Sequence, residues 1–67
     1  MISYKPMFET LKEKRLSLID VEKGIGISSK VTAKFRKDEH VSLETIQRIC
    51  EFLDVPIEKV IEIKRIK

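Results

Sequence analysis

The chain has 67 residues, of which 42% are hydrophobic and 37% charged, and its formal net charge is +3. This length fits a single domain spanning residues 1–67, and it is short for most enzyme scaffolds. Ile, Leu, Val and Phe recur along the whole chain, which argues against intrinsic disorder. Cys50 is the single cysteine, so an intramolecular disulfide and a thiolate zinc site are both excluded.

The first residues contain no apolar run of signal-peptide length, and no stretch approaches the roughly 18 apolar residues of a membrane span. The sequence therefore predicts a cytoplasmic protein with no membrane partner. It also predicts no cofactor, no metal and no small-molecule ligand. One His, one Cys and no glycine-rich phosphate loop favour a protein that is not an enzyme.

The first two predicted helices lie before the glycines. Pro6 suits the first turn of a helix over residues 6–14, because its missing N–H costs nothing there. Ser17 is a good N-cap for a second helix over residues 18–24, and Asp20 can bond back to it in a capping box. Gly24 and Gly26 then predict a sharp helix end and a tight turn.

A third helix is predicted over residues 29–37, with Ser28 as its cap. Thr32 and Phe35 share one face of this helix and should point inward, with Ile27 before them. The side chains expected to point outward are Ser29, Lys30, Ala33, Lys34 and Lys37.

Ser42 caps a fourth helix with the clearest amphipathic stripe in the chain, formed by Leu43, Ile46, Ile49, Cys50 and Leu53. Pro56 opens a short fifth helix, with Ile57, Val60 and Ile61 as apolar positions. Alternating residues at the C-terminal end and the β-prone residues 2–4 predict a small β-ribbon that joins the two ends. The predicted fold class is thus all-α with five helices, with this small β-ribbon added.

Positive charge is concentrated on the third helix. Residues 28–37 hold four basic and no acidic side chains, whereas residues 1–27 have a net charge of +1 and residues 38–67 of −2. By charge alone a solvated helix face is the simpler explanation, and a polyanion-binding surface is the alternative. However, a serine-capped helix behind a glycine turn also describes a helix-turn-helix, whose second helix fits a major groove about 12 Å wide. The two observations fall on one segment and together favour DNA binding.

Residues 17–53 resemble the Cro/CI-type (XRE-like) helix-turn-helix family. The likeness is greatest to its small single-domain bacterial branch, with an "ISY" lead (residues 2–4) and a "GISSxxxAK" recognition segment (residues 26–34). The "VSLETIQRIC" stretch at residues 41–50 resembles the fourth helix of that family. The resemblance implies a five-helix, lambda-repressor-like domain that binds double-stranded DNA.

The resemblance also implies which residues meet DNA. The implied base-contacting residues are Ser29, Lys30, Ala33 and Lys34, and the implied phosphate-contacting residues are Ser17, Ser28, Arg36, Lys37 and His40. For Arg36 the alternative is that its side chain covers the second helix. Asp38 and Glu39 would oppose phosphate contact. The sequence departs from the family pattern at Glu22, where a small alanine is common, and at Thr32, where an aliphatic residue is usual. Glu22 should point to solvent or pair with a basic residue of the third helix, and the packing between the second and third helices should be slightly loose.

The sequence therefore predicts a sequence-specific transcriptional regulator that forms a homodimer on a two-fold site. Phe52 and the isoleucines of the tail are candidate dimer contacts, although Phe52 would equally fit under the fifth helix. An alternative function is a protein-interaction module on the same fold, such as an antitoxin or an anti-regulator. Its partner would bind the acidic C-terminal half, which carries Glu44, Glu51, Asp54, Glu58 and Glu62.

Overall fold

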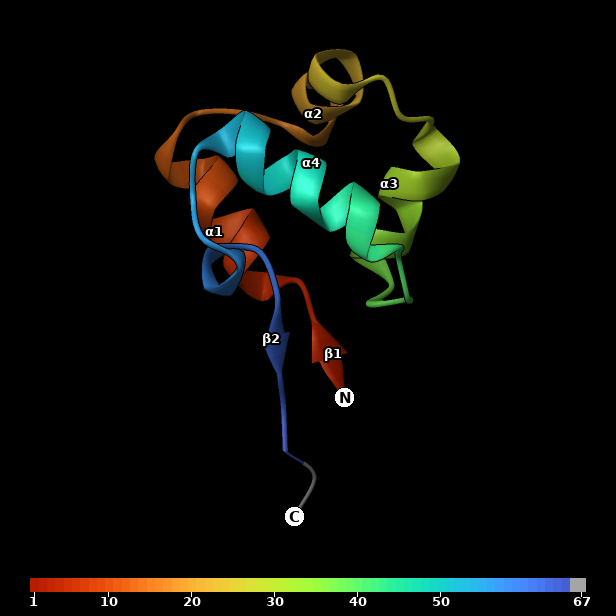
Figure 1. Cartoon of the computed structure of the whole chain (residues 1–67), viewed down its shortest axis with the longest axis vertical. Helices are drawn as coiled ribbons and strands as arrows, with labels where there is room; N and C mark the ends of the chain where they lie inside the picture. The colour runs from red at the N-terminus through yellow and green to blue at the C-terminus, as the bar shows by residue number, and fades with distance from the viewer. Residues whose placement is uncertain (66–67) are drawn as a thin grey trace.

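A computed structural model describes residues 1–65. Four α-helices surround a common core in this part of the chain, and two short strands project side by side from one end of the helical body (Figure 1). In chain order the elements are β1 (Ile2–Ser3), α1 (Lys5–Glu13), α2 (Leu18–Ile25), α3 (Ser29–Arg36), α4 (Leu43–Leu53), the 3-10 turn η1 (Ile57–Lys59) and β2 (Glu62–Ile63). None of the helices formed by residues 1–65 combines the length and the apolar character that crossing a membrane requires.

The prediction of five helices is wrong, because the described residues form four α-helices. Pro56 begins one turn of 3-10 helix rather than an α-helix, and the Val60 N–H bonds back to the Ile57 carbonyl. Val60 is fully buried, and Glu62 already lies beside β1. A longer helix would therefore displace both the Val60 anchor and the strand that follows.

The two helix starts with serine caps follow the predicted local chemistry. The Ser17 hydroxyl accepts a hydrogen bond from the Asp20 N–H at 3.4 Å, and the Asp20 carboxylate accepts one from the Ser17 N–H at 2.7 Å. This is the predicted capping box of α2. The Ser42 hydroxyl accepts a hydrogen bond from the Thr45 N–H at the start of α4. Gly26 ends α2 with a left-handed φ of 70°, where a side chain would be strained.

The core is centred on α4, which crosses the middle of the molecule between α1, α2 and α3 (Figure 1). Ile46, Ile49 and Leu53 of its stripe are buried, and Cys50 is half-buried against them. The same burial raises the pKa of the Cys50 thiol. Leu43 does not belong to the core as was predicted: it is the first residue of α4, and its side chain is 77% exposed.

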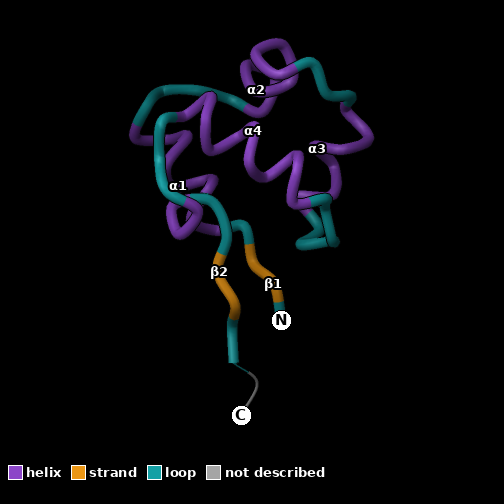
Figure 2. The backbone as a smooth tube through the Cα atoms, viewed as in Figure 1, coloured by secondary structure: helices purple, strands orange, loops and turns teal. Residues whose placement is uncertain are grey.

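The predicted β-ribbon is present, and it joins the two ends of the described chain (Figure 2). β1 and β2 are antiparallel, with Ile2 opposite Ile63 and Ser3 opposite Glu62. One residue further along, the Met1 amino group donates to the Lys64 carbonyl at 3.1 Å, and the Lys64 N–H donates to the Met1 carbonyl at 2.7 Å. The ribbon thus fixes the start of α1 relative to η1.

Candidate nucleic-acid interface

The site is built on α2 and α3, which are joined by residues 26–28. The left-handed Gly26 ends α2, and Ser28 has an extended backbone from which α3 begins in a new direction. The Arg48 guanidinium of α4 donates a hydrogen bond to the Ile25 carbonyl, which ties the last turn of α2 to α4. Two short helices joined by a three-residue, glycine-containing turn form a helix-turn-helix.

A hydrogen bond joins α2 directly to α3. Thr32 is fully buried, and its hydroxyl donates to the Glu22 carboxylate at 2.6 Å. The sequence predicted that Glu22 would point to solvent or pair with a basic residue, and both alternatives are wrong because its partner is Thr32. The packing is consequently tied by a charge-assisted hydrogen bond rather than loose.

We expect Thr32→Val to lower the free energy of unfolding by about 1–3 kcal/mol, because the half-buried Glu22 carboxylate loses its donor. Urea unfolding of this variant, of Glu22→Ala and of the double variant measures the effect. The double variant restores the small and aliphatic pair that is usual in the resembling family. It should therefore lose less stability than the two single variants together. Additive losses would show that the two side chains do not depend on each other.

The predicted base-contacting residues share one face of α3. Thr32 and Phe35 on the opposite face are fully buried and fix the rotation of the helix. Ser29, Lys30 and Lys34 are exposed, and Ala33 between them is half-buried. These four residues form an exposed strip of α3, in which the small Ala33 lies among one hydroxyl and two cationic side chains.

The predicted phosphate-contacting residues are not equivalent in the structure. Lys37 and His40 are exposed just beyond α3. Ser28 occupies the N-cap position of α3, but contrary to prediction its side chain makes no capping hydrogen bond. The Ser17 hydroxyl, in contrast, both accepts from the Asp20 N–H and donates to the Asp20 carboxylate. The Ser28 hydroxyl therefore makes no capping hydrogen bond that a phosphate contact would break. The Ser17 hydroxyl, in contrast, would have to give up its hydrogen bonds with Asp20 to contact a phosphate.

The capping box makes the start of α2 sensitive to acid. Hydrogen bonds from the Ser17 N–H and hydroxyl hold the pKa of the Asp20 carboxyl below its usual value. A lowered folded-state pKa means that the stabilisation is present above the unfolded pKa of about 3.9 and is lost as the pH falls through the folded value. We expect Asp20→Asn to be less stable than the natural chain at pH 7, with a difference that shrinks below about pH 4. Urea unfolding from pH 7 to pH 2.5 tests this, and a difference that does not change with pH would contradict it.

The loop after α3 is held by Tyr4, a contact that the sequence did not reveal. The Tyr4 hydroxyl donates to the Glu39 carbonyl at 2.7 Å, and the Tyr4 N–H donates to the Asp38 carboxylate at 3.0 Å. Burial raises the pKa of the Tyr4 hydroxyl. Asp38, which the sequence placed among acids that oppose phosphate contact, thus directs an oxygen toward the protein. It also has a left-handed φ of 54°, a conformation that a short polar side chain tolerates. These bonds fix the backbone on which Lys37 and His40 are carried.

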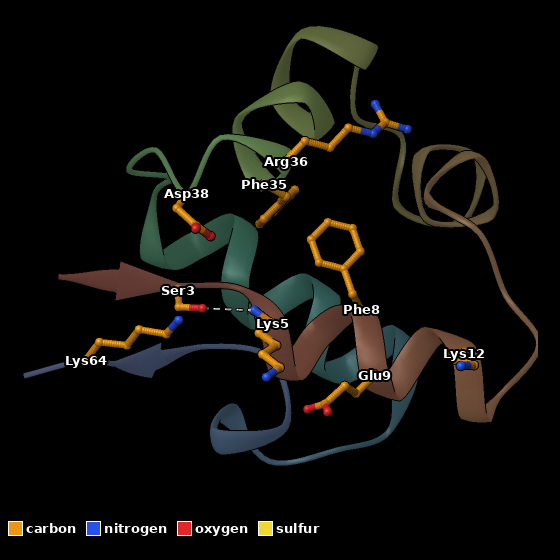
Figure 3. A pocket seen from close by; sticks show the side chains of 9 residues that line it. All are labelled: Ser3, Lys5, Phe8, Glu9, Lys12, Phe35, Arg36, Asp38 and Lys64. Carbon is orange, nitrogen blue, oxygen red and sulfur yellow. Dashed lines mark hydrogen bonds between the residues drawn. The ribbon is translucent and has the colours of Figure 1, made fainter.

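Arg36 lies at the edge of the α3 face, above an open groove of about 390 Å³. In Figure 3 the Phe8 ring points from α1 toward α3, Phe35 points inward, and Arg36 extends along the outside of α3. The other cations that line this groove are Lys5, Lys12 and Lys64, and its acidic residues are Glu9 and Asp38. Arg36 is exposed at this position, so its two predicted roles, a phosphate contact and a cover over α2, both stay predictions.

Comparison with known proteins agrees with this geometry. The sequence profile of the Cro/C1-type HTH DNA-binding domain matches residues 9–65, which is most of the chain. The chain belongs to the Cro/C1-type helix-turn-helix family. The family resemblance read from residues 17–53 is thereby confirmed. No protein with a curated description matches the sequence.

A solved structure is similar to this Cro/C1-type domain over nearly its full length. It is the crystal structure of the transcriptional regulator VanUg, with a TM-score of 0.87 and 30% sequence identity. The alignment covers 91% of this chain and 81% of the other. In the Cro/C1-type domain described here, α2 and α3 are the helix-turn-helix pair, and the basic strip of α3 is its exposed face.

Within the chain, Phe52 has a different neighbour from the fifth helix that was predicted for it. Its ring lies against Gly24 of α2 so closely that a Cβ at Gly24 would collide with it. The side chain stays 39% exposed. Phe52 therefore packs on the helix-turn-helix rather than under a fifth helix. Gly24, which the sequence placed at the end of the second helix, lies inside α2 and provides the space for this ring.

Proposed function

We propose that this protein is a sequence-specific transcriptional regulator that inserts α3 into the major groove and acts as a homodimer on a two-fold site. The observation that supports it most directly is the exposed strip of α3, where Lys30 and Lys34 flank the small Ala33. Lysine can donate to guanine O6 and N7, and a small residue lets the helix approach the base edges. Membership in a DNA-binding family and similarity to a transcriptional regulator support the same function.

Within this proposal Ser29, Lys30, Ala33 and Lys34 face the bases. Ser28, Arg36, Lys37 and His40 contact phosphates, and Ser17 does so only by leaving its cap. The hydrogen bonds of Tyr4 hold the backbone that carries Lys37 and His40 before DNA binds, which lowers the ordering cost of the complex. The hydrogen bond from Thr32 to Glu22 likewise fixes the orientation of α3 before DNA binds, which lowers the same ordering cost.

The test is selection from random-sequence duplex DNA over a salt series. A regulator that neutralises several phosphates loses affinity steeply as salt rises, and a dimer on a two-fold site enriches a palindrome. Two half-sites about 34 Å apart, one helical turn, are expected. A shallow salt dependence with no enriched motif would contradict the proposal. It would favour the protein-interaction alternative, in which exposed acids such as Glu44 and Glu58 bind a basic partner.

Lys37→Ala provides a finer test of the phosphate role. We expect it to weaken binding by a similar factor on all sequences and to reduce the slope of log affinity against log salt by about 1. Equilibrium binding to the selected duplex and to a scrambled one measures both quantities. A loss confined to the selected sequence would instead assign Lys37 to base recognition.

A further inference from the structure

The open groove between α1 and α3 has an apolar centre. The Phe8 ring extends from α1 toward α3, and Phe35 of α3 lines the same groove while pointing into the core (Figure 3). Phe35 is fully buried, whereas Phe8 stays 36% exposed although it is a large aromatic side chain. The groove has a volume of about 390 Å³. The Phe8 ring therefore offers apolar surface, in a concave site, to a second molecule.

Cationic side chains surround this apolar centre. Lys5, Phe8 and Lys12 line the groove at spacings i, i+3 and i+7, so they follow one stripe of α1, with a lysine on each side of the ring. Along the helix axis these two lysines are about 10 Å apart. Arg36 lies on the α3 side of the groove, and Lys64 extends at the same end as Lys5 (Figure 3). The ring thus has positive charge along α1 and across from it.

The acids of the groove leave these cations unneutralised. The Asp38 carboxylate accepts the Tyr4 N–H at 3.0 Å, so it is directed toward the protein. Glu9 is exposed and is the other acid of the groove. Among the nine described residues that line the groove, the hydrogen bond drawn joins the Lys5 N–H to the Ser3 hydroxyl, and none joins a cation to either acid (Figure 3). Four cations and two carboxylates give the groove an excess of positive charge.

This combination fits an acidic peptide segment better than a DNA duplex. The phosphate backbone of a duplex would match the cations, but it carries no apolar group to cover the Phe8 ring. A segment with acidic residues on both sides of an aromatic or aliphatic residue matches both features. In an extended peptide, acids placed two residues before and two residues after the apolar one are about 13 Å apart. Each acid therefore reaches one of the two lysines that flank the ring.

We propose that this groove is the docking site for an acidic segment of a partner protein, with an aromatic or aliphatic side chain against Phe8 and carboxylates on the surrounding cations. Complementary charge steers the partner to the groove, and the apolar anchor supplies affinity. Arg36 is also a phosphate contact in the proposed function, and this step of the inference rests on that function. A bound segment withdraws Arg36 from DNA, so the partner and the duplex compete for the chain.

Selection from a random-sequence peptide library displayed on phage, against the immobilised full-length chain, identifies the segment. We expect the enriched peptides to carry acids on both sides of an aromatic or aliphatic residue. Isothermal titration calorimetry with the synthetic form of the most enriched peptide then gives its dissociation constant. A library that enriches no peptide, or only peptides without acidic residues, would overturn the proposal.

A charge reversal tests the cations of the groove. Lys12→Glu should raise the dissociation constant of the peptide about tenfold or more, because it places a like charge where an acid binds. Lys14→Glu is the matched control, since Lys14 is exposed just after α1 and does not line the groove. It should change the dissociation constant by less than about threefold. Equal losses in the two variants would overturn the groove as the docking site.

A truncation tests the apolar centre. Phe8→Ala should raise the dissociation constant of the peptide about tenfold, because the anchor side chain loses the ring it covers. Ile19→Ala is the matched control, because it shortens an exposed apolar side chain on α2, outside the groove. It should leave peptide binding unchanged. Circular dichroism of every variant confirms that the domain is folded, and a folded Phe8→Ala variant with natural affinity would contradict the proposed anchor.

Competition with the selected duplex separates this inference from the proposed function. Saturating peptide should lower the affinity of the natural chain for the duplex about fivefold or more, measured by fluorescence anisotropy, because Arg36 is withdrawn. Lys12→Glu alone should lower duplex affinity by less than about threefold. A tenfold loss in that variant would place the groove in the DNA interface and overturn the peptide site.

The remaining outcomes are also distinct. A peptide that binds the groove without affecting the duplex would overturn the shared use of Arg36. A chain that binds the duplex but enriches no peptide would overturn the docking site and leave the DNA-binding proposal intact. A chain that binds the acidic peptide in the groove but enriches no duplex would support the docking site and contradict the proposed function.

Discussion

Replacing Lys30 and Lys34 together with alanine should lower the affinity for the selected duplex by about a hundredfold or more. Both side chains are exposed on the same face of α3, on either side of Ala33. A lysine that donates to a guanine edge contributes roughly 1–3 kcal/mol of discrimination, so losing two of them is a large effect. The fold should not change, because alanine is a strong helix former and neither lysine is buried. Fluorescence anisotropy at fixed salt measures the affinity.

The matched control for this variant replaces Lys14 and Lys59 with alanine. These lysines are also exposed, and their removal changes the net charge by the same amount. Lys14 follows α1 and Lys59 lies in η1, so neither belongs to the face of α3. We expect the control pair to weaken binding by less than about threefold through long-range charge alone. Equal losses in the two double variants would show that α3 contributes only general positive charge.

The elements that the sequence predicted correctly are those with local signals. The capping box needs only Ser17 and Asp20, which are three residues apart, and the ends of α2 and α4 are marked by neighbouring residues in the same way. The inward face of α3 follows from helical spacing, since Thr32 and Phe35 are on one side of any regular helix. Four α-helices and the outward strip of α3 could therefore be derived without long-range information.

The parts that the sequence missed depend on contacts between distant residues. Tyr4 and Asp38 are 34 residues apart, and no local pattern indicates that this acid bonds to a backbone N–H. The prediction of a fifth helix was wrong for a similar reason, because the pairing of β2 with β1 determines where the chain must turn after Pro56. In the sequence, Thr32 and Glu22 each look like an unfavourable departure from the family pattern. They become a hydrogen-bonded pair only when α2 and α3 are packed together.

Phe35→Ala should abolish cooperative folding at room temperature or leave a marginally stable domain. Phe35 is fully buried, and its ring contacts the Tyr4 ring edge-on with centroids 4.7 Å apart. A buried Phe→Ala substitution costs about 3–5 kcal/mol through lost burial and the cavity it leaves. A core in a chain of this size supplies roughly the same amount in total. Tyr4 would also lose the ring against which it packs, so the loop that carries Lys37 and His40 would loosen with the core.

Thermal unfolding monitored by circular dichroism measures this effect, with Phe8→Ala as the matched control. Phe8 lines the open groove between α1 and α3 and is 36% exposed, so the same substitution there should cost less, about 1 kcal/mol. For a domain of this length that loss corresponds to a melting temperature lower by about 4–8 °C. Phe35→Leu should fall between the two, because it keeps most of the buried volume. If Phe35→Ala melted as cooperatively as Phe8→Ala, then α3 would not be held by its buried face. The fixed orientation of its basic strip would then need another explanation.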